Sequence, residues 1–322
     1  MLDVVLVDSG FSARPLKQAM EIVGYRVHTV GARTSDALAI ENSLHHVLDY
    51  SNVDDLSRLI EQIKPAAVLP GCTDLSYEVC CQLADIGLID GFESIETLRQ
   101  LHDKAAFRSL CQRHNILAPQ TFESIDEALS ASCPMIIKPT DAFSGKGITV
   151  LEAPTHATIL SAQDAAMAVS RSKTFVMEER VMGQLFSFSA FLTHGRVERA
   201  VNVIEFGFVN PLVVDTSFVV DSKPVESTLT RSIEVLCEAL GLQGGLFHVQ
   251  YILTADGPSF IEVTRRCPGD LYSELIYRTS GFDYAARYTN SFLQASAPAG
   301  SKTHNQPVHK HAIRHTITGS KV

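Results

Sequence analysis

The sequence lacks the cysteine arrangements that mark two common classes of protein. Its seven cysteines are an odd number, are scattered along the chain and include no CxxC pair. They provide neither the paired framework of a small disulfide-stabilised secreted domain nor a recognisable metal or redox motif. We therefore expect reduced thiols and a cytoplasmic protein.

Long apolar runs are also missing. No run approaches the ~20 residues that a membrane-spanning helix requires. The chain passes from Met1 into the apolar residues 4–7 without the basic start and the small-residue cleavage site of a secretory signal. Neither membrane insertion nor export is expected, and internal repeats and low-complexity segments are lacking as well.

Positive charge is scarce. The 27 Lys and Arg residues are outnumbered by 36 Asp and Glu residues, which gives a formal net charge of -9. A protein that binds mainly nucleic acid needs a basic face, so no nucleic-acid partner is expected, although a local basic pocket for phosphates is allowed. A chain of 322 residues, 45% of them hydrophobic, is long enough for two or three globular domains.

The first part of the chain, residues 1–98, alternates short apolar runs with segments whose apolar residues recur at helical spacing. This alternation predicts an α/β domain with a parallel sheet. Its turn after the first strand offers only Gly10, whereas a dinucleotide-binding fingerprint needs three glycines, so NAD binding is not expected. The expected strands are 4–7, 25–30 and 66–69.

Two polar residues, Thr73 and Asp74, follow the third expected strand. Ligands in open sheets bind beyond the carboxyl ends of strands, so both residues are candidates for contact with a substrate. The capping preferences of Thr and Asp favour the simpler interpretation that they begin the helix near Leu75.

The remaining elements predict an α+β arrangement. Helical spacing runs from about residue 96 to 114, and Pro224 and Gly241 bound a further helix. Alternating apolar and polar residues after Gly183 predict antiparallel strands, the last two joined by the turn 255–258. Further expected helices are 125–129 and 164–170, and the expected strands are 135–138, 148–151, 174–178, 185–192, 197–208, 213–220, 247–253 and 259–263.

Lys138 ends the apolar run 135–137 and precedes Pro139. A cation that leaves an apolar strand needs a negative partner if it is buried, and a phosphate would serve. By itself, however, such a lysine is more often a chain-end charge that reaches solvent.

A glycine-bearing loop follows Lys138, with the sequence FSGKG at residues 143–147. Two glycines let backbone N–H groups converge on an anion without interference from Cβ atoms. The loop is not a Walker motif, because a strand and not a helix is expected after it. A two-glycine turn is also typical of a plain hairpin, so the nearby Lys138 is what favours anion binding by Ser144, Gly145, Lys146 and Gly147.

Gln250 and Glu262 lie on the two strands of the late hairpin, each flanked by apolar residues. An acid in such a place needs compensation. Mg²⁺ held by a carboxylate, an amide oxygen and nucleotide phosphates would provide it, since this cation prefers oxygen ligands. A carboxylate paired with Arg265 or Arg266 is the competing interpretation, and an arginine beside a metal could instead hold a transferring phosphoryl group.

The order of these segments resembles the ATP-grasp superfamily, in particular its carboxylate-amine ligase and carbamoyl-phosphate-synthase-like branch. The resemblance spans most of the chain. It is carried by an N-terminal Rossmann-like region and by the segments DKAAFRSLCQRHNILAPQTF, MIIKP with its SGKG loop, MEERVMG and GLFHVQYILTADGPSFIEVTRRCPGD. It implies an ATP-grasp fold: a Rossmann-like pre-ATP-grasp domain at 1–98 and an ATP-grasp domain at 99–322, with a lid subdomain at about 133–180 and a metal-binding subdomain at about 181–322.

The resemblance also implies how a nucleotide is bound. Lys104 and Lys138 would contact the phosphates of ATP, and the loop from Ser144 to Gly147 would close over them as a lid. By itself, Lys104 would be taken for a solvated helix charge. The adenine edge would be read, largely through backbone groups, by the hinge segment Glu178, Glu179, Arg180 and Val181.

The same resemblance places the metal and the reacting group at the late hairpin. Gln250 and Glu262 would hold Mg²⁺, with Mn²⁺ as an alternative, and Arg266 would stabilise the phosphorylated carboxylate. Thr264 stands where many members have an asparagine that completes the metal site, and its hydroxyl can still donate an oxygen.

Two further positions bear on the site. Leu185 stands where many members have a glutamate for the ribose hydroxyls, so ribose binding would need another residue such as Glu179. His248 lies two residues before Gln250 and either reaches the site or, as we favour, is a satisfied core histidine.

We therefore expect an ATP-dependent ligase that joins a small carboxylic acid to an amine through an acyl phosphate, with Lys138 and Arg266 as its catalytic residues. The alternatives are an ATP-binding module with weakened catalysis, suggested by Leu185 and Thr264, and an ATP-grasp enzyme that uses bicarbonate or another small acceptor. A non-enzymatic scaffold would leave the two lysines, the loop and the Gln250–Glu262 pair unexplained. A homodimer is compatible with the sequence.

Overall fold

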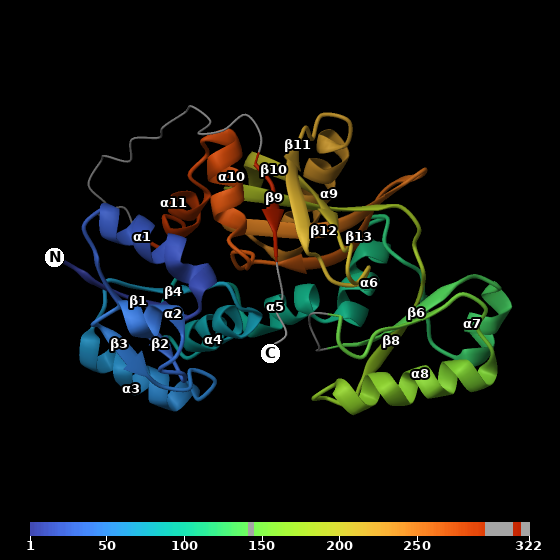
Figure 1. Cartoon of the computed structure of the whole chain (residues 1–322), viewed down its shortest axis with the longest axis horizontal. Helices are drawn as coiled ribbons and strands as arrows, with labels where there is room; N and C mark the ends of the chain where they lie inside the picture. The colour runs from blue at the N-terminus through green and yellow to red at the C-terminus, as the bar shows by residue number, and fades with distance from the viewer. Residues whose placement is uncertain (141–144, 294–311, 317–322) are drawn as a thin grey trace.

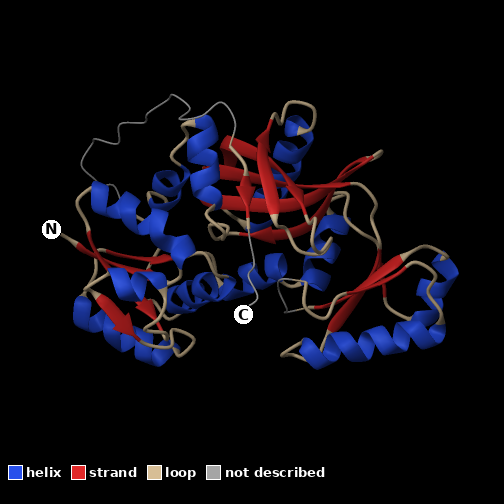
Figure 2. Ribbon diagram, in the orientation of Figure 1, coloured by secondary structure: helices blue, strands red, loops and turns tan. Residues whose placement is uncertain are grey.

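The computed structural model of the protein describes residues 1–140, 145–293 and 312–316. These residues form three separate sheets with helices packed against them (Figures 1 and 2). The N-terminal sheet and the second sheet, each of four strands, lie at opposite ends of the long axis. The large third sheet and helices α5 and α6 lie between them.

The N-terminal sheet is parallel, with strand order β3-β2-β1-β4. Val4 and Leu6 of β1 (Asp3–Val7) pack on the side of α1, and Val5 and Val7 pack on the side of α3 and α4. Both faces of the central strand are therefore buried, as a parallel sheet requires, and the predicted α/β arrangement is confirmed. The other elements are β2 (Arg26–Gly31), β3 (His45–Val47), β4 (Ala67–Pro70), η1 (Phe11–Ala13), α1 (Arg14–Ile22), α2 (Ala37–Glu41), α3 (Val53–Ile63) and α4 (Asp74–Asp85).

The expected helical stretch from 96 to 114 is two helices, α5 (Ile95–His102) and α6 (Lys104–Arg113). Asp103 between them has an extended backbone (φ -74°, ψ 123°), and its carboxylate accepts a hydrogen bond from the Ala106 N–H at 2.8 Å. The capping aspartate ends one helix and begins the next. As a result Lys104 is the first residue of a helix, where a side chain can reach past the helix end.

The second sheet is antiparallel, with strand order β5-β8-β6-β7. Helices α7 (Ile125–Ala131) and α8 (His156–Val169) cover it, and α8 is longer than the expected helix 164–170. The strands are β5 (Thr121–Phe122), β6 (Met135–Pro139), β7 (Thr149–Leu151) and β8 (Phe175–Glu179).

The third sheet has the order β13-β12-β9-β10-β11-β14 and is antiparallel throughout. One face packs against α6 and α9, and part of the other packs against α1, α10 and α11. Helices α10 and α11 follow Arg266 and were not expected. The elements are β9 (Gln184–Thr193), β10 (Arg196–Phe206), β11 (Thr216–Val220), α9 (Glu226–Leu240), β12 (Gly245–Thr254), β13 (Gly257–Thr264), α10 (Tyr272–Ser280), α11 (Tyr284–Thr289) and β14 (Arg314–His315).

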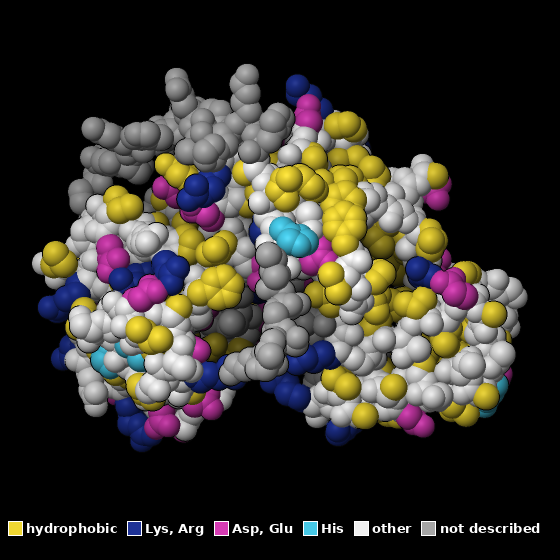
Figure 3. All heavy atoms as spheres, in the orientation of Figure 1, with side chains coloured by type: hydrophobic (Ala, Val, Ile, Leu, Met, Phe, Trp, Pro, Cys, Tyr) yellow, Lys and Arg dark blue, Asp and Glu magenta, His cyan; other side chains and the backbone are white. Residues whose placement is uncertain are grey.

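On the face drawn in Figure 3, Lys and Arg side chains are interspersed with Asp and Glu side chains. No helix within the described ranges is both long and apolar enough to cross a membrane.

Candidate active site

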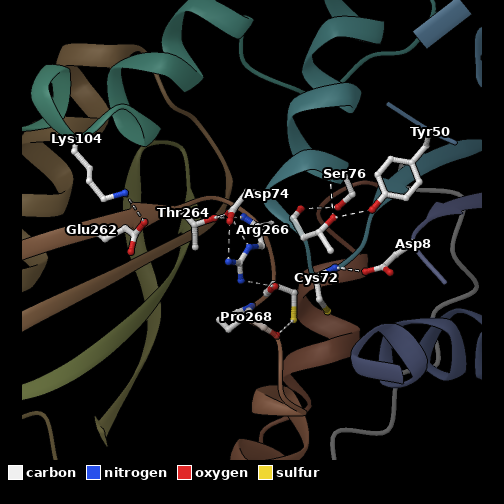
Figure 4. Close-up of polar contacts among 12 residues, drawn as sticks. Asp8, Tyr50, Cys72, Asp74, Ser76, Lys104, Glu262, Thr264, Arg266 and Pro268 are labelled. Carbon is white, nitrogen blue, oxygen red and sulfur yellow. Dashed lines mark hydrogen bonds and ion pairs between the residues drawn. The ribbon is translucent and has the colours of Figure 1, made fainter. Parts of the chain in front are cut away.

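Lys104 connects the second sheet to the third. Its Nζ donates to the Thr140 carbonyl oxygen at 3.4 Å, just beyond β6, and lies 3.6 Å from Glu262 Oε1 on β13. The side chain is only 13% exposed, so the interpretation as a solvated helix charge is wrong. Figure 4 shows the ammonium pointing toward Glu262.

Lys138 is buried, and its negative partner is Glu178. The Lys138 Nζ lies 2.8 Å from Glu178 Oε2, and Arg108 Nε lies 2.8 Å from Glu178 Oε1. Burial alone would raise the pKa of Glu178, but the charges of Lys138 and Arg108 outweigh it and lower the pKa. The alternative in which Lys138 reaches solvent is wrong. The carboxylate of Glu178 holds two cations, and the backbone role of Glu178 in the hinge stays a prediction.

Arg108 was missed in the sequence. It lies one helical turn after Lys104 on α6, and its Nη2 donates to the carbonyl oxygen of Ile261, the residue before Glu262, at 2.6 Å. Spacing of i, i+4 from Lys104 places both side chains on one face of the helix and was the available signal. Through Arg108 and Glu178, the structure brings Lys104, Lys138 and Glu262 to one junction of α6, β6 and β13.

The hinge segment at the end of β8 is tied to its surroundings by backbone bonds. The Glu179 N–H donates to Gln120 O at 2.9 Å, and the Arg180 N–H donates to Pro134 O at 2.8 Å. The Glu179 carboxylate accepts the Gln120 N–H at 3.0 Å, and Arg180 pairs with Glu152. Val181 follows where the chain leaves the second sheet for β9. The adenine and ribose roles of this segment stay predictions.

The described part of the glycine loop begins at Gly145, and Ser144 lies outside the described residues. Gly145 and Gly147 have φ values of 70° and 71°, which favour glycine, and Lys146 lies between them. A Cβ at Gly147 would lie 2.9 Å from Pro139 Cγ, so the backbone passes close to the end of β6. The last residue of the loop therefore lies next to the strand that carries Lys138.

Gln250 and Glu262 are direct partners across β12 and β13. The Glu262 side chain is 52% exposed and pairs with Lys104, not with Arg265 or Arg266, so that alternative is wrong. Arg265 is buried against Glu93 at 3.0 Å. The amide of Gln250 donates to Glu205 Oε2 at 2.8 Å.

Arg266 pairs with Asp74, at the carboxyl edge of the N-terminal sheet. Arg266 Nε lies 2.8 Å from Asp74 Oδ1, Nη2 lies 3.2 Å from Oδ2, and the Thr264 hydroxyl donates to Oδ1 at 3.2 Å (Figure 4). Burial alone would raise the pKa of Asp74, but Arg266 lowers it to about 2. Thr264 is therefore engaged by Asp74 as well as being a candidate metal ligand.

Thr73 and Asp74 begin helix α4, in agreement with the simpler interpretation that these two residues start the helix near Leu75. The Thr73 hydroxyl accepts the Ser76 N–H at 3.1 Å as the N-cap of α4, and Tyr50 Oη lies 3.1 Å from it. Asp74 begins α4 and also contacts the Arg266 guanidinium, so its part in substrate contact stays a prediction. Asp8 directly follows β1 and accepts the Cys72 N–H at 2.7 Å.

His248 is a satisfied core histidine, as favoured from the sequence. Its Nδ1 lies 2.8 Å from the Ser189 hydroxyl, and burial lowers its pKa to about 3. The ring is therefore neutral near pH 7 and carries no charge into the site.

The oxygen chemistry of the hairpin fits a nucleotide-bound Mg²⁺. The exposed Glu262 carboxylate and the amide oxygen of Gln250 are hard ligands, and Mg²⁺ usually takes one or two protein oxygens with phosphates and water. No group of three or more His, Cys, Asp or Glu side chains suited to a metal occurs within residues 1–140, 145–293 and 312–316. A site completed by the nucleotide agrees with this.

The fold and the site define the class. The chain has the ATP-grasp fold, and its sequence resembles those of ATP-grasp enzymes. The prediction of an ATP-grasp ligase is confirmed at this level. No family model matches the sequence.

Individual relatives are distant. The chain is 26% identical over 283 residues to a formate-dependent phosphoribosylglycinamide formyltransferase of Variovorax paradoxus, a match that covers 82% of this chain and 69% of that protein. It is 22% identical over 321 residues to dapdiamide A synthase of Enterobacter agglomerans, and this match covers 90% of this chain and 73% of that protein.

Solved structures resemble the chain over nearly its whole length. An L-amino acid ligase from Bacillus licheniformis has a TM-score of 0.77 at 14% identity and covers 100% of this chain and 81% of that one. A phosphoribosylglycinamide synthetase from Anaerococcus prevotii has a TM-score of 0.72 at 16% identity, with coverage of 91% and 75%. At these identities the likeness concerns the fold.

Proposed function

We propose that the protein is an ATP-dependent carboxylate–amine ligase that activates a small carboxylic acid as an acyl phosphate. The observation that carries the proposal is the position of Lys104, whose ammonium lies between the Thr140 carbonyl beyond β6 and the Glu262 carboxylate on β13. Two lysines, Lys104 and Lys138, and the exposed carboxylate of Glu262 at one junction suit the binding of a magnesium-bound triphosphate.

The roles follow from the positions. Lys104 and Lys138 bind the phosphates, and Gln250 and Glu262 provide the oxygens for Mg²⁺, which neutralises phosphate charge when bound. Thr264 is a candidate for an additional oxygen ligand. Glu178 holds Lys138 in place from within the core. The loop with Gly145, Lys146 and Gly147 covers the phosphates, and Glu179 to Val181 line the nucleoside.

The reaction has two steps. A carboxylate oxygen attacks the γ-phosphorus of ATP, the bond to the β-γ bridging oxygen breaks, and ADP leaves. The amine nitrogen then attacks the acyl carbon, phosphate leaves with the bonding electrons, and the amine loses a proton, which gives an amide. Arg266 stabilises the oxyanion of the second step, and exclusion of water protects the acyl phosphate.

The acid and the amine are small molecules. The dapdiamide synthase and the L-amino acid ligase support amide formation between amino-acid-like substrates. The formate-dependent relative supports a smaller acid. We also propose that residues 1–98 and 99–322 act as separate domains, with a lid at about 133–180 and a metal-binding part at about 181–322.

The test is a screen for ADP release with Mg-ATP and pairs of acids and amines, followed by identification of the product by mass spectrometry. Glu262→Gln should abolish the signal, whereas Glu234→Gln on α9, which weakens an ion pair with Arg196, should not. ATP binding without ADP release under any pair would favour the weakened module. ADP release that depends on bicarbonate or another small acceptor, with a correspondingly altered product, would favour the other alternative.

A further inference from the structure

Glu205 is a buried carboxylate at the end of β10 that no step of the proposed reaction uses. It is 4% exposed, and each of its oxygens accepts one hydrogen bond. The Ser187 hydroxyl donates to Oε1 at 2.9 Å, and Gln250 Nε2 donates to Oε2 at 2.8 Å. The two donors come from different strands, β9 and β12, so the carboxylate is held from two sides.

The bond to Gln250 fixes which way its amide faces. Gln250 Nε2 donates to Glu205 Oε2 at 2.8 Å, so the NH₂ group faces Glu205 and the amide oxygen is the atom left for other contacts. Burial raises the pKa of Glu205, and the hydrogen bonds from Ser187 and Gln250 oppose this rise by stabilising the ionised form. Gln250 is the register partner of Glu262, and register partners project from the same face of a sheet. We propose that Glu205 is a positioning residue that presents the Gln250 amide oxygen, beside Glu262, to the nucleotide-bound divalent cation.

The surroundings hold Glu205 in this role. Ser187 has one hydroxyl hydrogen, which goes to Glu205, so the hydroxyl of Tyr272, 2.9 Å away, donates to Ser187. Tyr272 is 1% exposed at the start of α10. On the neighbouring strand, Ser217 is the register partner of Glu205 and accepts from Arg314 Nη2 at 2.7 Å, which brings a cation to this side of the carboxylate.

The residue pair is also matched in charge. One carboxylate and one amide form a single charge-assisted bond, whereas two carboxylates at 2.8 Å would repel each other. Partners that orient a metal ligand typically change metal affinity by about 10- to 100-fold when they are replaced. The inference rests on the proposed function, since it assumes a nucleotide-bound cation at Gln250 and Glu262.

The experiment measures Mn²⁺ binding in the presence of ADP, from the electron paramagnetic resonance signal of free Mn²⁺. The proteins are the wild type, Glu205→Gln, Gln250→Glu and the double variant. Glu198→Gln, an exposed carboxylate on the same strand that pairs with Arg287, is the matched control. Glu205→Gln should weaken Mn²⁺ binding about 10-fold. The amide introduced at position 205 can both donate and accept a hydrogen bond, so it no longer fixes which end of the Gln250 amide faces the cation.

The double variant should bind Mn²⁺ more tightly than either single variant, since the amide introduced at position 205 can then donate to the carboxylate introduced at position 250. Unchanged affinity in Glu205→Gln, or additive effects of the two changes, would overturn the inference while wild-type binding and turnover leave the proposed function standing. Absence of Mn²⁺-ADP binding and turnover in the wild type would instead overturn the proposed function. If Glu205→Gln does not fold, Ser187→Ala removes one of the two donors to Glu205 and should weaken Mn²⁺ binding, and unchanged affinity there would also overturn the inference.

Discussion

Arg266 and Asp74 are 192 positions apart in the sequence and form a bidentate pair between the third sheet and the N-terminal sheet. If Arg266 stabilises the oxyanion, Arg266→Ala should lower turnover by about 10²- to 10³-fold, the usual loss for one such donor. Steady-state ADP release measures the effect. Arg278→Ala removes an exposed arginine paired with Glu274 and should leave the rate unchanged. A near-normal rate for Arg266→Ala would remove this residue from the mechanism.

Asp74 gives a prediction for the dependence of stability on pH. Its pKa falls from 3.8 to about 2 on folding, because Arg266 stabilises the ionised form. A pKa that is lower in the folded state stabilises the folded protein at pH values above the pKa of the unfolded state. This contribution is lost as the pH falls through the pKa of the folded state. The difference in free energy of unfolding between the wild type and Asp74→Asn should therefore be constant above about pH 5 and shrink as the pH falls from about 5 to 2, as measured by urea denaturation. A difference that is independent of pH across this range would contradict the assignment.

At the scale of the element, the glycine loop depends on Gly147. Its φ is 71°, and a Cβ would lie 2.9 Å from Pro139 Cγ and 3.0 Å from Val169 Cβ. Gly147→Ala should displace the loop and raise the KM for ATP by about 10-fold, since about 1 kcal/mol of backbone strain is added to the crowding. Gly87→Ala is a matched control, because Gly87 has a φ of 75° but no atom within 4 Å of the position that a Cβ would take. The control should lose stability without a change in KM, and equal KM values in the two variants would argue against a role of the loop.

Secondary structure was largely predictable because it is coded locally. The hairpin of β12 and β13 follows the expected turn, and α9 ends at Gly241, whose φ of 68° suits glycine. The break at Asp103 was not foreseen, since the apolar spacing continues across it and only the capping geometry ends α5. Helices α10 and α11 were missed, although their buried tyrosines, Tyr272, Tyr284 and Tyr288, pack beneath the third sheet.

At the scale of the whole molecule, Arg108 joins the second sheet to the third. It pairs with Glu178 on β8 and donates to the Ile261 carbonyl on β13. Arg108→Met would leave the buried Glu178 with Lys138 alone and should lower the free energy of unfolding by about 3–5 kcal/mol, as for other broken buried pairs. It should also raise the KM for ATP, because Lys138 is then held less firmly.

The control for Arg108 is Arg113→Met, an exposed position on the same helix, which should change neither quantity. Chemical denaturation and ATP titrations measure both effects. Loss of stability with an unchanged KM would show that Arg108 supports the fold without positioning the lysine.

The sequence by itself determined most of the strands and helices, the glycine loop and the candidate lysines, because periodicity and turn chemistry act between residues close in the chain. The short strands β3 and β5 were not expected. Only the tertiary structure decided which charges meet. Lys138 pairs with Glu178 across 40 residues of sequence, Arg266 pairs with Asp74 across 192 residues, and Gln250 bonds to Glu205 across 45 residues. Such partners are chosen by how the three sheets pack, since a buried charge takes whichever opposite charge or hydrogen-bond partner the packing brings within reach.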